Sequence, residues 1–155
     1  MALNHEFFFL PNDLHPSNRI EWYYHNRNTW KHKVELSDDI VTYIIDFLNW
    51  VPTYNPETKV EGFGLNYYGI TFINNEGSKK LLNVLNSWSS LIHEAPDIIN
   101  FKGPTIWREE PDGDTYWEET RNKISKTKYL LEIQKLIDFA KQSSNNKGYI
   151  MHYGI

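Results

Sequence analysis

The chain has 155 residues, a length that suits one domain with a sizeable core. Its formal net charge of −4 argues against nucleic acid as the main partner, because binding phosphates requires a positive field. It contains no cysteine, which excludes disulfides, thiolate metal sites and cysteine nucleophiles.

The first third of the chain, residues 1–35, is rich in aromatic side chains and is predicted to be an N-terminal arm or strand region. Within it, residues 19–26 have a strand-like composition. The opening MALNHEFFFLPND has no basic start, and Pro11 breaks its apolar run, so no secretory signal is expected. Apolar runs also fall far short of the ~20 residues that a membrane span needs. We therefore expect a cytoplasmic protein with no membrane association.

Three helices are predicted where apolar side chains recur at spacings of three and four. The first covers residues 37–51, with Ser37 as its N-cap, and Pro52 ends it. The second begins near Ser78, its expected cap, and stops before Pro96. The third covers about residues 126–142.

Strands are predicted between and after these helices. Residues 53–64 contain Pro56, Gly62 and Gly64 and are predicted to be a loop. Residues 66–73 are apolar or aromatic on both faces, which favours a central strand. Residues 97–103 and 149–153 complete the expected sheet. The fold class is therefore α+β: a single domain over residues 1–155, with three main helices packed on a sheet of about four or five strands, mostly antiparallel, in an order that the sequence does not give.

Between residues 104 and 124 lies the most informative segment, an acidic and aromatic hairpin or loop. Six carboxylates fall within eleven residues that contain no Lys or Arg: Glu109, Glu110, Asp112, Asp114, Glu118 and Glu119. Three aromatic rings lie beside or among them: Trp107, Tyr116 and Trp117. Pro111, Asp112 and Gly113 form a turn signal, so residues 106–110 and 115–121 are predicted to pair. Crowded carboxylates attract a basic partner, and aromatic rings provide interface anchors.

Other interpretations of this segment stay open at this stage. Its charges could simply solvate a hairpin and keep a sheet edge from aggregating. The clustered oxygens could also bind a cation, although their spacing does not match a calcium loop.

A rival binding surface is predicted from residues 19–33. There Arg19, Arg27, Lys31 and Lys33 are interleaved with the rings of Trp22, Tyr23, Tyr24 and Trp30. Single-stranded nucleic acid is bound by such mixtures of positive charge and stacking rings. Glu21 and Glu35 dilute that charge, and the alternative is that these rings partly cover the sheet.

Catalytic and metal signatures are weak throughout the chain. The six histidines form no His-x-x-x-His pair and no His-Glu-x-x-His run. The sequence has no nucleophile elbow and no phosphate-binding loop. We therefore expect no catalytic residue, no cofactor and no metal. A small enzyme with an unrecognised pocket around His25, His32 or His152 remains an alternative.

The run NYYGITFI, EGSKKLLNVLNSWSSL and EAPDIINFKG, closed by YIMHYGI, resembles small bacterial immunity proteins, the inhibitors of polymorphic or contact-dependent toxins. This resemblance covers a little over half of the chain. It implies a cytoplasmic, non-catalytic protein that neutralises one toxin domain, often a basic nuclease. No individual functional residue can be transferred, because the contacting residues differ from pair to pair.

The sequence as a whole predicts an immunity or antitoxin-like inhibitor rather than an enzyme. In this hypothesis the six carboxylates steer and pair with lysine or arginine, while the three rings anchor a basic toxin domain. A homodimer is also possible, since excess surface aromatic residues often mark self-association.

Overall fold

The computed structural model describes residues 4–155, apart from the side chain of Pro104. Its main sheet has six strands in the order β2-β1-β8-β5-β3-β4, and every neighbouring pair is antiparallel. These strands are β1 (Asn4–Pro11), β2 (Lys33–Ser37), β3 (Pro52–Asn55), β4 (Val60–Phe63), β5 (Ile70–Ile73) and β8 (Gly148–Tyr153). A separate two-stranded sheet pairs β6 (Ile98–Glu109) with β7 (Thr115–Ser125). The helices of the described chain are α1 (Arg19–Asn26), α2 (Asp38–Leu48), α3 (Asn75–His93) and α4 (Lys126–Ser144).

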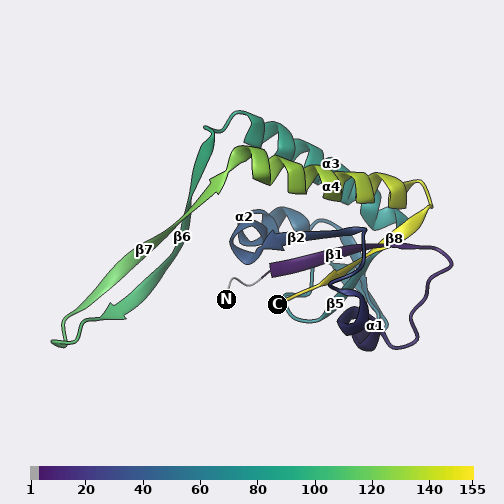
Figure 1. Cartoon of the computed structure of the whole chain (residues 1–155), viewed down its shortest axis with the longest axis horizontal. Coiled ribbons are helices and arrows are strands. Elements are labelled where there is room, and N and C mark those ends of the chain that lie inside the picture. The colour runs from purple at the N-terminus through teal and green to yellow at the C-terminus, as the bar shows by residue number, and fades with distance from the viewer. Residues whose placement is uncertain (1–3) are drawn as a thin grey trace.

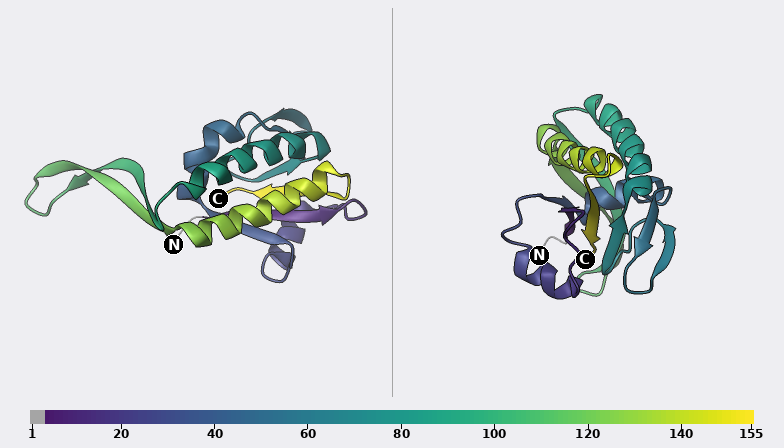
Figure 2. Two further views of the ribbon diagram at one scale, coloured as in Figure 1. Left: turned by 90° about the horizontal axis from the view of Figure 1, so that it is seen from above. Right: turned by 90° about the vertical axis from the view of Figure 1, so that its right-hand side faces the viewer.

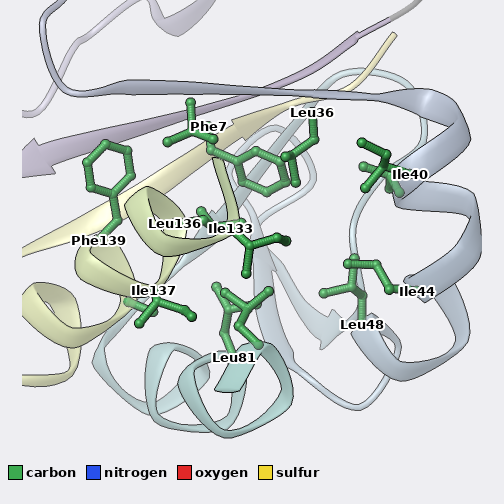
Figure 3. Close-up of a cluster of buried hydrophobic side chains, with 14 of the residues drawn as sticks. Phe7, Leu36, Ile40, Ile44, Leu48, Leu81, Ile133, Leu136, Ile137 and Phe139 are labelled. Atoms are coloured by element: carbon green, nitrogen blue, oxygen red, sulfur yellow. The ribbon is translucent and has the colours of Figure 1, made fainter. Parts of the chain in front are cut away.

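Both faces of the main sheet are covered by other parts of the chain. Successive side chains of β1 point to opposite faces, so this one strand contributes to a core on each side. Phe7 and Phe9 join the larger core. α2, α3 and α4 cover this core, and Figure 3 shows Phe7 among their buried side chains. Phe8 and Leu10 join a smaller core on the other face, where Tyr23 of α1 packs. The two cores explain why the run FFFL is apolar at every position.

The α+β class and the antiparallel sheet are confirmed, but the predicted counts are too low. Four helices replace three, and the main sheet alone has six strands. The missed helix is α1, which the sequence predicts as a strand or extended segment. Asn18 caps it by accepting a hydrogen bond from the Glu21 backbone N–H, and its rings pack on the sheet, so local capping and tertiary contacts override the strand propensity. Residues 1–3 of the predicted N-terminal region lie outside the described residues.

The predicted loop at residues 53–64 is wrong, because β3 and β4 form a hairpin there. Its turn is held by the Asn55 side chain, which accepts hydrogen bonds from the backbone of Glu57 and Thr58. Residues 66–73 do form an interior strand, but it begins only at Ile70.

Helix boundaries were predicted to within a few residues, whereas one cap was assigned to the wrong residue. Asn74 caps α3 by accepting a hydrogen bond from the Gly77 backbone. Ser78 lies inside that helix and donates its buried hydroxyl to Ser143 of α4. Ser37 precedes α2 as expected, but its side chain makes no capping hydrogen bond.

The hairpin of β6 and β7 projects away from the rest of the molecule, as Figures 1 and 2 show. We call it the projecting hairpin, residues 98–125. Its longer strand has 12 residues. At about 3.4 Å per residue, such a strand extends about 40 Å. The sequence predicts residues 97–103 and 106–110 as separate strands, but they form one continuous strand with a β-bulge between Lys102 and Thr105.

Candidate functional site

The base of the projecting hairpin is fixed to the main core. Phe101 of β6 lies between Tyr43 of α2 and Tyr129 of α4, with ring centroids 4.3 and 6.1 Å away. Ile99 is buried beside them, and Ile124 of β7 packs against the same core. The rest of the hairpin is therefore held at one end only.

The outer half of the hairpin carries a pair of exposed tryptophans. Trp107 of β6 and Trp117 of β7 are direct cross-strand partners, and their ring centroids lie 5.0 Å apart in an edge-to-face arrangement. Their exposed fractions are 54% and 65%. Large rings left this exposed stabilise the core little, which is the usual sign of a binding surface.

Tyr116 does not belong to the same surface as the two tryptophans. It is 44% exposed, but it neighbours Trp117 in the strand and so points to the opposite face of the hairpin. The sequence predicts three rings acting together, whereas the structure brings together only Trp107 and Trp117.

Two of the six predicted carboxylates are already paired within the chain. Glu118 accepts a hydrogen bond from Arg108 at 2.8 Å. Glu119 contacts Lys102 at 2.7 Å and Arg121 at 3.1 Å. These contacts, the Lys102 hydrogen bond first, lower the pKa of Glu119, and Glu118 raises the pKa of Arg108. Glu118 and Glu119 are therefore partly neutralised within the chain, by basic residues that lie outside the eleven-residue acidic run in sequence.

The other four carboxylates cluster at the far end of the hairpin. Glu109, Glu110, Asp112 and Asp114 are all exposed, and none of them has an ion pair within residues 4–155. The turn that presents them has Gly113 at a φ of 91°, and Asp112 accepts a hydrogen bond from the Asp114 backbone N–H. We call these four residues the acidic tip.

The rival surface at residues 19–33 is largely used for intramolecular contacts. The Arg27 guanidinium lies over the Tyr23 ring and contacts Glu6, which also pairs with Lys33. Trp22 packs edge to face on Phe8, and the Trp30 indole donates a hydrogen bond to the Phe9 carbonyl. Most of these rings are therefore packed on the sheet, and Tyr24 is the most exposed of them.

The histidines named for a hidden pocket do not come together. His25 is exposed on α1, where its ring bonds the Glu21 carbonyl, and His32 is exposed before β2. His152 is fully buried on β8. Within the described residues, no three His, Asp or Glu side chains are grouped so that they could hold a metal ion.

One buried polar network was missed by the sequence reasoning. His5 Nδ1 lies 2.8 Å from His152 Nε2, and His5 Nε2 lies 3.1 Å from an Asp38 carboxylate oxygen. Tyr67 donates its hydroxyl to the other Asp38 oxygen. With Asp38 accepting, the His5 proton sits on Nε2, so His5 Nδ1 accepts from His152. Burial lowers the pKa of both histidines, and His152 Nδ1 has no partner in the described chain.

The hollows on the body include two that combine a size suited to small ligands with a distinctive lining. A groove of about 400 Å³ between α2 and α3 is apolar and includes Phe47, Trp50, Trp88 and Leu91. A cleft of about 500 Å³ lies beside the hairpin base and includes Lys33, Lys123, Lys128 and Lys135. We call the second hollow the lysine cleft.

Comparison of the chain with protein families, with curated proteins and with solved structures finds no match. Among residues 4–155, none of the helices combines the length and apolarity that crossing a bilayer demands.

Proposed function

We propose that this chain is an immunity or antitoxin-like inhibitor that binds and neutralises a basic toxin domain through its projecting hairpin. The single observation that supports this most strongly is the combination of the exposed Trp107–Trp117 pair with the acidic tip, on an element that extends away from the core. Neither feature is required to bury the core of the body, since only the base of the hairpin packs there.

The acidic tip would act mainly during encounter. Its four carboxylates are exposed, unpaired in the described chain and adjacent to one another, so their fields add. Charges of this kind raise the association rate with a basic protein, and salt screens them. Glu118 and Glu119 contribute less, because Arg108, Lys102 and Arg121 already offset their charge.

The tryptophan pair would act after encounter. Each ring offers a large apolar surface held in place by its cross-strand partner, so little entropy is lost when a partner covers it. Removing one ring should therefore accelerate dissociation more than it slows association.

The test uses the polypeptide domain encoded immediately upstream of this gene, expressed as the candidate toxin. Co-expression of the chain should restore growth, and the purified pair should associate with a rate constant that falls as salt rises. Reversing all four acidic tip charges to lysine should slow association, and Trp117→Ala should accelerate dissociation about tenfold or more.

Matched controls come from the body of the same chain. Trp50→Ala removes a ring that is 59% exposed, and Tyr116→Ala removes a ring from the other face of the hairpin. Both variants should protect cells as well as the parent chain does. Unchanged affinity after the four charge reversals together with Trp117→Ala would refute the proposed surface.

A further inference from the structure

We propose that the projecting hairpins of two copies of this chain pair along β7, forming a symmetric dimer with a four-stranded sheet in the order β6-β7-β7-β6. This inference does not need the proposed function, because it concerns contacts between two copies of the chain, but a dimer that covers the acidic tip would compete with a basic partner for that tip. It follows from the two open edges of the hairpin, from the difference between those edges, and from the order of charges along β7.

Both long edges of the hairpin are open in the single chain. Within residues 4–155, β6 and β7 form strand pairs with each other alone. Each strand therefore leaves a row of backbone N–H and C=O groups on its outer side, which is a template for another strand. A two-stranded ribbon is also marginally stable by itself, so a further strand would stabilise it.

The two edges are not equivalent. β6 contains Gly103 and Pro104, which oppose a single residue of β7 at the bulge, and Pro104 has no backbone N–H. A bulge and a proline both break the regular alternation that a new strand would need. β7 runs from Thr115 to Ser125 with neither proline nor glycine and without a bulge of its own, so it is the edge that can be extended.

The charges of β7 are arranged so that the strand complements itself in the antiparallel direction. Its first half carries Glu118 and Glu119, and its second half carries Arg121 and Lys123. When two copies pair about residue 120, Glu119 of each lies opposite Arg121 of the other, in addition to the Lys102 and Arg121 that it contacts in its own chain. Opposite charges in this position stabilise a strand pair.

Neighbouring registers place like charges opposite each other on the axis. Pairing centred on residue 119 would place Glu119 opposite Glu119, and pairing centred on residue 121 would place Arg121 opposite Arg121, although Glu119 would then face Lys123. Like charges directly opposite one another are destabilising, so the charge pattern favours residue 120, where no like charges meet. A two-fold axis there makes the contact self-complementary and closed.

The same arrangement explains the lysine cleft at the hairpin base. Antiparallel pairing brings the acidic tip of one copy to the base of the other, where Lys123 and Lys128 have no ion pair within the described residues. At the end of the paired strands, Asp114 of one copy comes level with the start of α4 in the second copy, so the acidic tip lies near the base that carries Lys123 and Lys128. The two acidic tips and the two clefts are thus complementary, and the Trp107–Trp117 pairs of both copies lie on the same face of the joined sheet.

Exchange of charges about the axis gives a sharp test. Glu119→Arg places arginine opposite arginine, and Arg121→Glu places glutamate opposite glutamate. Each variant turns two attractions per dimer into two repulsions, so the dimer Kd should rise about tenfold or more. An equimolar mixture of the two variants restores both attractions and should form a mixed dimer, and the double variant Glu119→Arg/Arg121→Glu should dimerise by itself.

Light scattering after size-exclusion chromatography and sedimentation equilibrium measure these states. Circular dichroism from the coupled Trp107 and Trp117 indoles confirms in each variant that the hairpin is intact, and Glu57→Arg on the β3–β4 turn is the control for charge. A parent chain that stays monomeric at every concentration would overturn the proposal. So would a dimer that Glu119→Arg leaves unchanged, or two single variants that do not associate when mixed. Toxin binding is measured separately with the parent chain at concentrations below the dimer Kd, so failure of the dimer and failure of the proposed function are distinguishable.

Discussion

At the scale of single residues, the buried His5–His152 pair is the feature that sequence patterns could not show. The two residues are 147 positions apart and meet only because β1 and β8 are neighbours in the sheet. Sequence spacing reveals two histidines that could bind a metal from the same helix. It does not reveal two histidines that meet because their strands are neighbours in a sheet. The pair contributes a pH dependence to the stability of the fold.

We expect the free energy of unfolding to fall as the pH drops below about 6.5, the ordinary pKa of histidine. Burial lowers the pKa of both His5 and His152 in the folded chain, so the unfolded chain binds more protons in this range. For one group the slope approaches about 1.4 kcal/mol per pH unit. Urea unfolding between about pH 7 and pH 5 measures it.

The variant His152→Gln should flatten this slope, because its amide can donate to His5 without titrating. His93→Gln, at the exposed end of α3, is the matched control and should keep the slope of the parent chain. Equal slopes in the parent chain and His152→Gln would show that the buried pair does not set the acid sensitivity.

Trp117→Ala should change the hairpin without weakening the body. Because the ring is 65% exposed and contacts Trp107, we expect loss of the coupled indole signal in circular dichroism. The free energy of global unfolding should change by less than about 1 kcal/mol. A larger loss in urea unfolding would mean that the hairpin is part of the cooperative core.

At the scale of elements, the sequence predicts long amphipathic helices well and short or context-dependent elements badly. α2, α3 and α4 have apolar stripes that repeat over several turns. α1 has only 8 residues, and a single cap with contacts to the sheet decides its conformation. The length of the projecting hairpin was missed for a related reason: Gly103 and Pro104 look like a strand end, whereas they form a bulge within β6.

Gly77 in the first turn of α3 gives a test in which packing opposes helix propensity. Alanine favours helices by about 1 kcal/mol over glycine, yet a Cβ at this position would collide with the Pro52 carbonyl and with Ile73. We therefore expect Gly77→Ala to destabilise the chain by about 1–3 kcal/mol. Thermal unfolding against Gly62→Ala, whose Cβ meets nothing within 4 Å, checks this, and a stabilised Gly77→Ala would contradict it.

At the scale of the whole molecule, the body and the projecting hairpin should behave as separable parts. The core contacts of the hairpin come from Ile99, Phe101 and Ile124, near its base. Replacing residues 102–121 by Asn-Gly would join Phe101 to Asn122, which are already cross-strand partners, through a favoured two-residue turn.

This shortened chain should unfold with a free energy within about 0.5 kcal/mol of the parent value. It should lose both self-association and any affinity for a basic partner, as measured by urea unfolding and sedimentation. A shortened chain that cannot fold would show that the hairpin belongs to the core. The turn signal at Pro111, Asp112 and Gly113 predicts that the flanking residues pair, and β6 and β7 do pair there. The division of this hairpin into a tryptophan face, a tyrosine face and an acidic tip depends on strand register, which composition does not encode.

The irregular middle of β6 limits how far strands can be added. A two-stranded hairpin with two regular open edges could add further copies at both edges without limit, as strands do in fibrils. Here the bulge at Gly103 and Pro104 prevents regular strand addition at the outer edge of β6, so assembly stops once two copies have paired along β7. The molecule can thus carry a long projecting hairpin with open strand edges without forming polymers.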